Sequence, residues 1–215
     1  MKILVTGFTP FGEESINPAW EVVSSLPKAY LGAQLVPLCI PTAFERCLEP
    51  LLRAVDEEQV DAVVLVGQAG GRTCVTPEFA AINWQEARIP DNDGFQPQGH
   101  PLEAQGPCAY FATLPVHQMV AAIQGEGLPA TLSYTAGTFV CNAVFYRVLH
   151  SLAQQKRDLP AGFIHVPFIP SQTADKPQYA SMNPQDIQQA LLAALRVLIE
   201  PSKSPRPMAA LGTTH

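Results

Sequence analysis

One cysteine stands in apolar company at the predicted start of a helix. Cys141 lies in the stretch "AGTFVCNAVFY", just after a predicted strand over 130–136, and residues 140–155 have the pattern of a helix. Apolar surroundings are typical of an unreactive core thiol. A helix N-terminus instead presents unpaired N–H groups and the positive end of the dipole, which favour the thiolate. We therefore take Cys141 as the candidate nucleophile, with a packed core thiol as the alternative.

A cysteine nucleophile needs a base that accepts the thiol proton and later returns it. His165 lies near the end of the segment "GFIHVPF", within a strand predicted over 161–168, and none of the other four histidines occupies such a strand. Taken alone, a histidine in this position is typically a core residue bonded to the backbone. Together with Cys141 it predicts a Cys–His dyad.

Two candidate carboxylates and a glycine-rich run lie in the long stretch from residue 67 to 108. Glu78 stands beside the apolar letters "FAAIN", where a carboxylate needs a partner unless it sits on a strand edge. Asp91, in "RIPDNDG", has the simpler interpretation of a turn residue. The run "GQAGG" could cradle a phosphate, but it lacks the lysine of a P-loop and is a weak nucleotide signal.

The elements that must position these residues alternate between strand and helix. Apolar runs predict strands over 2–8, 33–40, 61–67, 130–136 and 161–168. Amphipathic patterns predict helices over 18–26, 43–58, 116–124 and 140–155, and a last one that starts at Pro184 behind Asn183. The stretch 67–108 is irregular, with one short strand predicted at 79–83, and its length is typical of a functional loop.

This alternation predicts the α/β fold class. We expect a single domain over 1–199 with three layers, α/β/α, around a mainly parallel twisted sheet. The proline-rich tail 200–215 is expected to be disordered. Ligands of such sheets bind at the carboxyl ends of the strands, which is where 130–136 and 161–168 would bring Cys141 and His165.

Composition excludes several classes of protein. The 215 residues carry a net charge of −6 with no basic block, which argues against a nucleic-acid partner. The N-terminus lacks a signal-like apolar run, and no apolar run is long enough to span a bilayer, so we expect a cytoplasmic protein without a membrane partner. The five cysteines are irregularly spaced without a CxxC pair, which favours reduced thiols over disulfides or a zinc site.

Five segments, found in order along the chain, carry a family resemblance. They are "TGFTPFGEESINPAWE", "GQAGGRTCVTPEFAAIN", "ARIPDNDG", "AGTFVCNAVFY" and "GFIHVPF". Together they cover roughly residues 1 to 199 and resemble the pyroglutamyl peptidase I (pyrrolidone-carboxylate peptidase) family of cysteine peptidases. The resemblance implies removal of an N-terminal pyroglutamate from peptides through a thioester acyl-enzyme. It also implies that no cofactor is needed and that the protein is a homotetramer.

The resemblance assigns roles to particular residues. It makes Cys141 the nucleophile, His165 its base and Glu78 the third member of a triad. Arg88 and Asp91 match positions that support the site, and Arg88 could assist the Cys141 N–H in an oxyanion hole. The chain departs from the family at the position after Glu78, where it has Phe79 and the family usually has a basic residue.

Pyroglutamate also predicts the character of the substrate pocket. The residue is an uncharged lactam with one N–H donor, one C=O acceptor and two apolar faces, so its pocket needs aromatic walls and a few polar partners. The candidate walls are Phe8, Phe11, Phe139 and Val140, and the candidate polar partners are Asn17 and Gln68. From the residues alone the phenylalanines could equally be core and Asn17 an N-cap, whereas the resemblance favours Phe8 and Phe11 as walls.

Two other functions compete with a cysteine peptidase. A nucleoside phosphorylase-like transferase is suggested by the α/β alternation and by the "GQAGG" loop; it would depend on phosphate and tolerate loss of Cys141. A binding protein without catalysis could use the same scaffold, although no residue argues positively for it.

Overall fold

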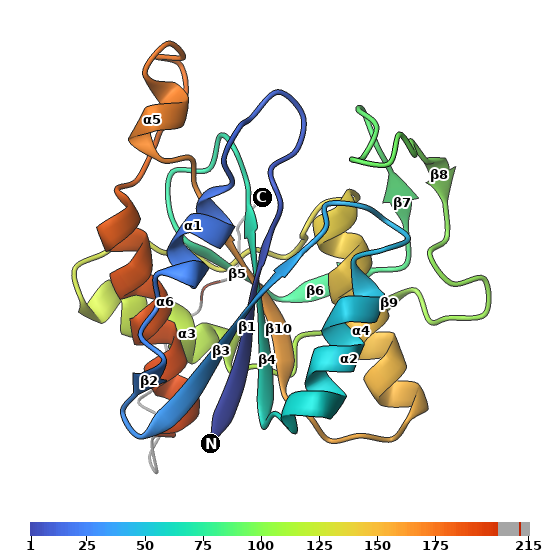
Figure 1. Ribbon diagram of the computed structural model, residues 1–215, viewed down its shortest axis with the longest axis horizontal. Helices are drawn as coiled ribbons and strands as arrows, with labels where there is room; N and C mark the ends of the chain where they lie inside the picture. Colours follow the sequence, from blue (N-terminus) through green and yellow to red (C-terminus); the bar gives the residue numbers. More distant parts are fainter. Residues whose placement is uncertain (202–210, 212–215) are drawn as a thin grey trace.

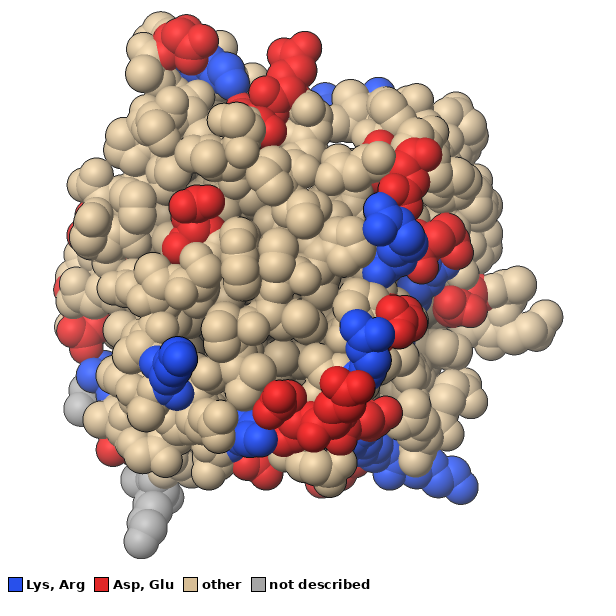
Figure 2. All heavy atoms as spheres, viewed as in Figure 1, with Lys and Arg blue, Asp and Glu red and all other residues tan. Residues whose placement is uncertain are grey.

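The computed structural model describes residues 1–201 and 211. Most of the predicted tail 200–215 therefore lies outside the described residues. Within them, no helix has the length and apolar character needed to cross a membrane. Acidic and basic side chains are intermixed on the face shown in Figure 2, where no continuous basic patch appears.

A six-stranded sheet forms the centre of the protein. Its strands lie in the order β2 (Ala29–Tyr30), β3 (Ala33–Ile40), β1 (Lys2–Phe8), β4 (Ala62–Gln68), β10 (Ala161–Val166) and β5 (Thr76–Glu78). The four strands β3, β1, β4 and β10 are parallel, whereas β2 and β5 are antiparallel edges. All seven residues of β4 are buried, as expected for an apolar strand covered on both faces.

Helices cover both faces of this sheet (Figure 1). On one face α1 (Pro18–Ser24), α3 (Val116–Gly125) and α6 (Pro184–Ile199) enclose one apolar core, and on the other α2 (Leu48–Glu58) and α4 (Val140–Gln154) enclose a second. The short helix α5 (Pro170–Thr173) follows β10. The predicted α/β fold with three layers and a mainly parallel sheet is confirmed.

Local sequence explains where two of the helices begin. Helix α1 starts at Pro18, and Asn17 accepts a hydrogen bond from the Ala19 N–H, as predicted for an N-cap followed by proline. The helix predicted over 43–58 instead begins at Leu48, which leaves Cys47 just before it. Pro50 then falls in the first turn, where its missing N–H costs no hydrogen bond.

Two predictions about strands are wrong. Residues 130–136 form no regular strand; they run beside residues 75–79 with isolated bridges such as Glu78 to Ser133. The stretch 67–108 is more ordered than predicted, since it holds β5, β6 (Ala80–Ile82), β7 (Gln85–Glu86) and β8 (Gln98–His100), and β6 pairs with β9 (Ala109–Phe111). Short strands that pair with distant partners leave little periodicity in the sequence, which is why the pattern failed there.

Candidate active site

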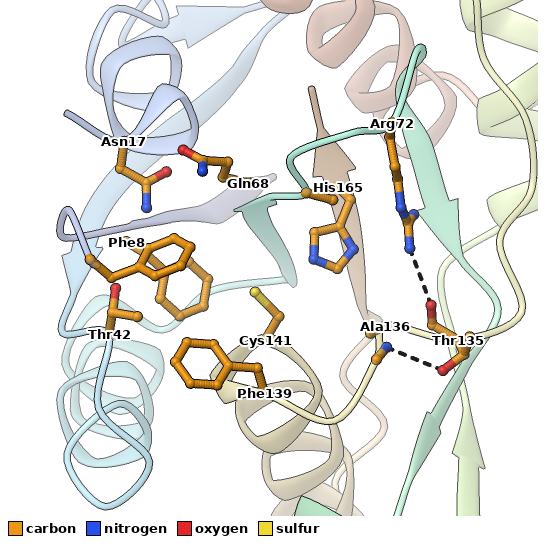
Figure 3. Close-up of a pocket in the computed structure, with 13 residues that line it drawn as sticks. Phe8, Asn17, Thr42, Gln68, Arg72, Thr135, Ala136, Phe139, Cys141 and His165 are labelled. Atoms are coloured by element: carbon orange, nitrogen blue, oxygen red, sulfur yellow. Dashed lines mark hydrogen bonds between the residues drawn. The ribbon is translucent and has the colours of Figure 1, made fainter. Parts of the chain in front are cut away.

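Three side chains meet at the carboxyl end of the parallel strands. His165 is the fifth residue of β10, Glu78 is the last residue of β5, and Cys141 is the second residue of α4. Figure 3 shows Cys141 and His165 side by side at one pocket. The predicted strand and helix ends placed Cys141 and His165 at this edge, and the structure brings Glu78, which the resemblance predicted, to the same place.

Glu78 and His165 form a buried, hydrogen-bonded pair. Glu78 Oε1 lies 2.6 Å from His165 Nδ1, and both side chains are almost completely buried. In the antiparallel ladder Glu78 faces Phe163 and Thr76 faces His165, so Glu78 and His165 are diagonal neighbours on one face. The pair fixes the ring so that the opposite nitrogen, Nε2, is free of Glu78.

Arg72 is a site residue that our sequence analysis missed. Its Nη1 donates to Glu78 Oε1 over 2.6 Å and also contacts Thr76 Oγ1, while Nη2 donates to the Thr135 carbonyl over 3.3 Å. The other carboxylate oxygen, Glu78 Oε2, is buried without a hydrogen-bond partner among the described residues. Glu78 Oε1 thus carries both polar contacts of the carboxylate. The only signal in the sequence was a lone cation shortly after the "GQAGG" run.

Cys141 lies at the site because it belongs to the first turn of α4. No side chain within the described residues caps this helix, so its first N–H groups have no side-chain acceptor there. The neighbouring Asn142 is buried and hydrogen-bonds through its amide to the backbone of Ile82 and Trp84, which anchors the helix start. A Cβ placed on Gly67 would lie 3.0 Å from Cys141 Sγ, so the end of β4 packs directly against the thiol.

Burial sets the protonation of the two reactive groups. It raises the pKa of Cys141 to about 12, helped by the negative charge of Glu78. Burial also lowers the pKa of His165, although its bond to Glu78 works in the opposite direction. The direction of the Cys141 shift is opposite to the thiolate that we expected at a helix N-terminus. These shifts favour a neutral thiol and a neutral imidazole, and no hydrogen bond joins the two side chains in the described part of the chain.

The pocket is a cavity of about 280 Å³ with a mostly apolar wall. The residues that line it are Phe8, Phe11, Asn17, Thr42, Gln68, Ala69, Arg72, Thr135, Ala136, Gly137, Phe139, Cys141 and His165. Its aromatic and amide side chains gather on one side of Cys141, and His165, Arg72 and Thr135 lie on the other (Figure 3). The lining contains no carboxylate.

Most of the predicted pocket residues do line this cavity. Phe8, Phe11 and Phe139 supply aromatic wall, and the rings of Phe11 and Phe139 lie 5.8 Å apart. The prediction for Val140 is corrected, because its side chain is fully buried in the core that α4 shares with the sheet. Asn17 lines the pocket but already uses its amide, which accepts from Ala19 and donates to the Thr9 carbonyl.

The two predicted supporting residues lie farther from the thiol. Arg88 is exposed and lines a separate hollow, which shares only Phe11 and Phe139 with the pocket, so the structure does not place it at an oxyanion hole. Asp91 is buried, accepts hydrogen bonds from three backbone N–H groups, and makes no contact with His165. One of those donors is Phe44, whose ring packs edge-on against Phe139. Asp91 therefore supports the pocket wall indirectly.

Two further motifs from the sequence have structural explanations. Phe79, where the chain departs from the resembled family, packs on Phe111 and Tyr134, and it does not line the pocket. In the "GQAGG" run, a Cβ on Gly67 would overlap the ring of Phe163, and a Cβ on Gly70 would overlap the ring of Phe168. These glycines are needed for close packing, which removes the reason to suspect a phosphate cradle.

Comparisons with known proteins agree with one another. A family model described as pyroglutamyl peptidase matches residues 1–201. A pyrrolidone-carboxylate peptidase of Streptococcus pyogenes is 48% identical over 200 residues, which cover 93% of each chain.

Solved structures show the same likeness. Pyroglutamyl peptidase I from Bacillus amyloliquefaciens superposes with a TM-score of 0.87 at 45% identity, covering 90% of this chain and 93% of that one. A mutant pyrrolidone carboxyl peptidase from the hyperthermophile Pyrococcus furiosus gives a TM-score of 0.89 at 37% identity, covering 94% and 99%.

Proposed function

The chain belongs to the pyroglutamyl peptidase family, and from that premise we propose that Cys141, His165 and Glu78 are its catalytic triad. It is a cysteine peptidase that removes an N-terminal pyroglutamyl residue from peptides. The observation that carries the proposed triad is the buried Glu78–His165 pair at a pocket that also receives Cys141.

Acylation starts from the neutral pair. As the Cys141 sulfur attacks the carbonyl carbon of pyroglutamate, His165 Nε2 accepts the thiol proton. The carbonyl oxygen becomes an oxyanion, and the open N–H groups at the start of α4, that of Cys141 first, stabilise it. His165 then gives its proton to the departing amine, the C–N bond breaks, and a pyroglutamyl thioester remains.

Deacylation repeats these steps with water. His165 takes a proton from the water as it attacks the thioester carbonyl. It then gives that proton to the departing sulfur as the C–S bond breaks, which releases pyroglutamate and regenerates the thiol. During both steps the imidazole becomes positively charged, and the adjacent Glu78 stabilises that charge. Arg72 holds the same carboxylate oxygen and acts as a positioning residue for the pair.

Specificity follows from the lining of the pocket. Aromatic rings suit the flat, uncharged lactam, and a free ammonium group would find no carboxylate among the lining residues. Peptides that begin with glutamine or glutamate should therefore be excluded, because an N-terminal charge would be buried without a partner. The leaving peptide would extend on the Arg72 and Thr135 side of Cys141.

A fluorogenic assay tests this function directly. The purified chain should release the fluorophore from a pyroglutamyl amide without added phosphate, and iodoacetamide should abolish the release once it has alkylated Cys141. The matching glutaminyl and prolyl amides should react at least about 10²-fold more slowly in kcat/KM. Comparable hydrolysis of the glutaminyl amide, or a requirement for phosphate, would contradict the proposal.

We also propose a cytoplasmic location and a homotetramer. All five cysteines are unpaired, which supports a reducing compartment. The tetramer rests on the family alone. Light scattering coupled to size-exclusion chromatography tests it, since a tetramer would have about four times the 23.2 kDa chain mass. A monomer at micromolar concentration would refute it.

A further inference from the structure

A chain of amide hydrogen bonds reaches the pocket from helix α5. Gln172 is buried, and its Nε2 donates to Gln68 Oε1 over 3.1 Å and to Glu14 Oε2 over 3.0 Å. Its Oε1 accepts from the Ile169 N–H over 3.2 Å. Gln68 lines the catalytic pocket, on the Phe8 and Asn17 side of Cys141 in Figure 3.

The two ends of this chain determine which way each amide points. The Ile169 backbone N–H can only donate, so it requires the oxygen of Gln172. The Glu14 carboxylate accepts, so it requires the nitrogen of Gln172. Burial opposes the charge of Glu14, but hydrogen bonds from Lys176 and Gln172 outweigh this and lower the pKa of its carboxyl. The orientation of the Gln172 amide is therefore set by groups of unambiguous polarity.

The orientation of Gln172 in turn sets that of Gln68. The atom of Gln68 that faces the Gln172 nitrogen must be an acceptor, which assigns it as Oε1. The remaining atom, Gln68 Nε2, donates no hydrogen bond within the described residues and is not fully buried. It is thus presented to the pocket as a donor. A lactam carbonyl is the acceptor that matches it.

We propose that Gln172 is a specificity-determining positioning residue, which locks the Gln68 amide with its N–H toward the pocket to bind the ring carbonyl of pyroglutamate. The proposal rests on the proposed function, since it assumes a lactam in the pocket. It gives Gln172 a role although this residue touches neither the substrate nor the triad. Glu14 contributes by holding Gln172 from the loop that also carries Phe11.

Two variants of Gln172 test this chain of amide hydrogen bonds. Gln172→Met keeps the length of the side chain but removes both polar atoms, so Gln68 becomes free to rotate. Gln172→Glu, made in a Glu14→Gln background to avoid two facing carboxylates, offers only acceptors to Gln68. Gln68 must then turn its Nε2 away from the pocket and present Oε1, which repels a lactam carbonyl.

The experiment measures kcat and KM for a pyroglutamyl amide and for the cyclopentanecarbonyl amide of the same fluorophore, whose five-membered ring lacks both lactam groups. We expect Gln172→Met to raise KM for the pyroglutamyl amide about 3- to 10-fold with kcat within about 3-fold of wild type. Gln172→Glu in the Glu14→Gln background should lower kcat/KM about 10- to 100-fold relative to Glu14→Gln itself. Neither change should alter kcat/KM for the cyclopentanecarbonyl amide by more than about 3-fold.

Two controls separate this effect from general damage. Gln188→Met removes a glutamine on α6 that bonds to Ser25, away from the site, and should leave both substrates unaffected. The rate at which iodoacetamide alkylates Cys141 should stay unchanged in Gln172→Met, because the triad is intact.

The outcomes distinguish this inference from the function beneath it. A wild-type chain that does not hydrolyse the pyroglutamyl amide would refute the proposed function. Active wild type with unchanged KM in Gln172→Met, or equal losses on both substrates in either Gln172 variant, would overturn the role of Gln172 alone. If Gln172→Met fails to fold, the comparison of the double variant with Glu14→Gln decides in the same way.

Discussion

Glu78 and His165 lie diagonally across the only antiparallel contact that β10 makes in the described structure, with Glu78 Oε1 2.6 Å from His165 Nδ1. The arrangement means that the base is oriented by an edge strand, while the nucleophile comes from a helix on one face of the sheet. Each member of the proposed triad can therefore be changed without altering the backbone that carries the others.

Cys141→Ser should lower kcat for a pyroglutamyl amide by at least about 10³-fold, because a hydroxyl is a far weaker nucleophile when paired with this imidazole. Its melting temperature should stay within about 2 °C of wild type, given the small change in volume. The exposed Cys108 provides the control, and Cys108→Ser should keep full activity. A folded but inactive Cys108→Ser beside an active Cys141→Ser would show that the nucleophile is misassigned.

Glu78→Gln should lower kcat by about 10²- to 10⁴-fold and leave KM within a few-fold. The amide keeps the shape and can keep an oxygen at the Oε1 position, but it removes the charge that stabilises imidazolium. Steady-state kinetics on the pyroglutamyl amide at one pH, with circular dichroism to check folding, measure the effect.

Asp91→Asn is the matched control for that carboxylate. Asp91 accepts from the backbone N–H groups of Phe44, Asp93 and Phe95, so replacing one of its oxygens should cost about 1–3 kcal/mol in free energy of unfolding. Its kcat should fall less than that of Glu78→Gln. A larger loss of kcat in Asp91→Asn would exchange the two roles.

Arg72→Ala should lower kcat about 10- to 100-fold, because the buried Glu78 carboxylate loses its guanidinium partner and the Glu78–His165 pair loosens. Added guanidinium ion should restore part of the activity, which a merely misfolded variant would not show. Arg53→Ala, which removes an exposed cation paired with Glu49 on α2, should have no effect. Full activity of Arg72→Ala would leave Arg72 without a positioning role.

The pH dependence should report a neutral Cys141–His165 pair. Burial lowers the pKa of His165, and the imidazole acts as a base only above its pKa. The midpoint of the acid limb in the pH profile of kcat/KM should therefore lie below the ordinary histidine pKa of about 6.5. The pKa of Cys141 is raised to about 12, so alkylation of the free enzyme by iodoacetamide should keep increasing with pH from 7 to 10. A plateau of the alkylation rate near neutral pH would reveal a preformed thiolate instead.

Gly67→Ala should damage both stability and catalysis. The added Cβ would lie 2.6 Å from the Phe163 ring and 3.0 Å from Cys141 Sγ, so the ring or the thiol must move. We expect a loss of about 1–3 kcal/mol in free energy of unfolding and a reduced kcat. Denaturant melts and kinetics measure the two effects. Gly125→Ala is the comparison, because nothing lies within 4 Å of its added Cβ.

Local sequence determined the fold class and two of the three positions of the proposed triad. Apolar runs such as residues 61–67 predict strands that are covered on both faces. Because helices alternate with these strands, the strands run parallel and their carboxyl ends lie at a common edge. Cys141 at a helix start and His165 near a strand end could therefore be brought to that edge without knowledge of any long-range contact.

The remaining features depend on contacts between segments far apart in the chain. Glu78 reaches His165 only because β5 returns antiparallel along β10, a pairing that a three-residue strand does not reveal in its sequence. The position of Arg72 at the site also depends on tertiary contacts, as does the orientation that Gln172 gives to Gln68 from 104 residues away. Helix position alone favoured a thiolate at Cys141, whereas desolvation by the surrounding tertiary structure and the charge of Glu78 raise the pKa of the thiol and favour its neutral form.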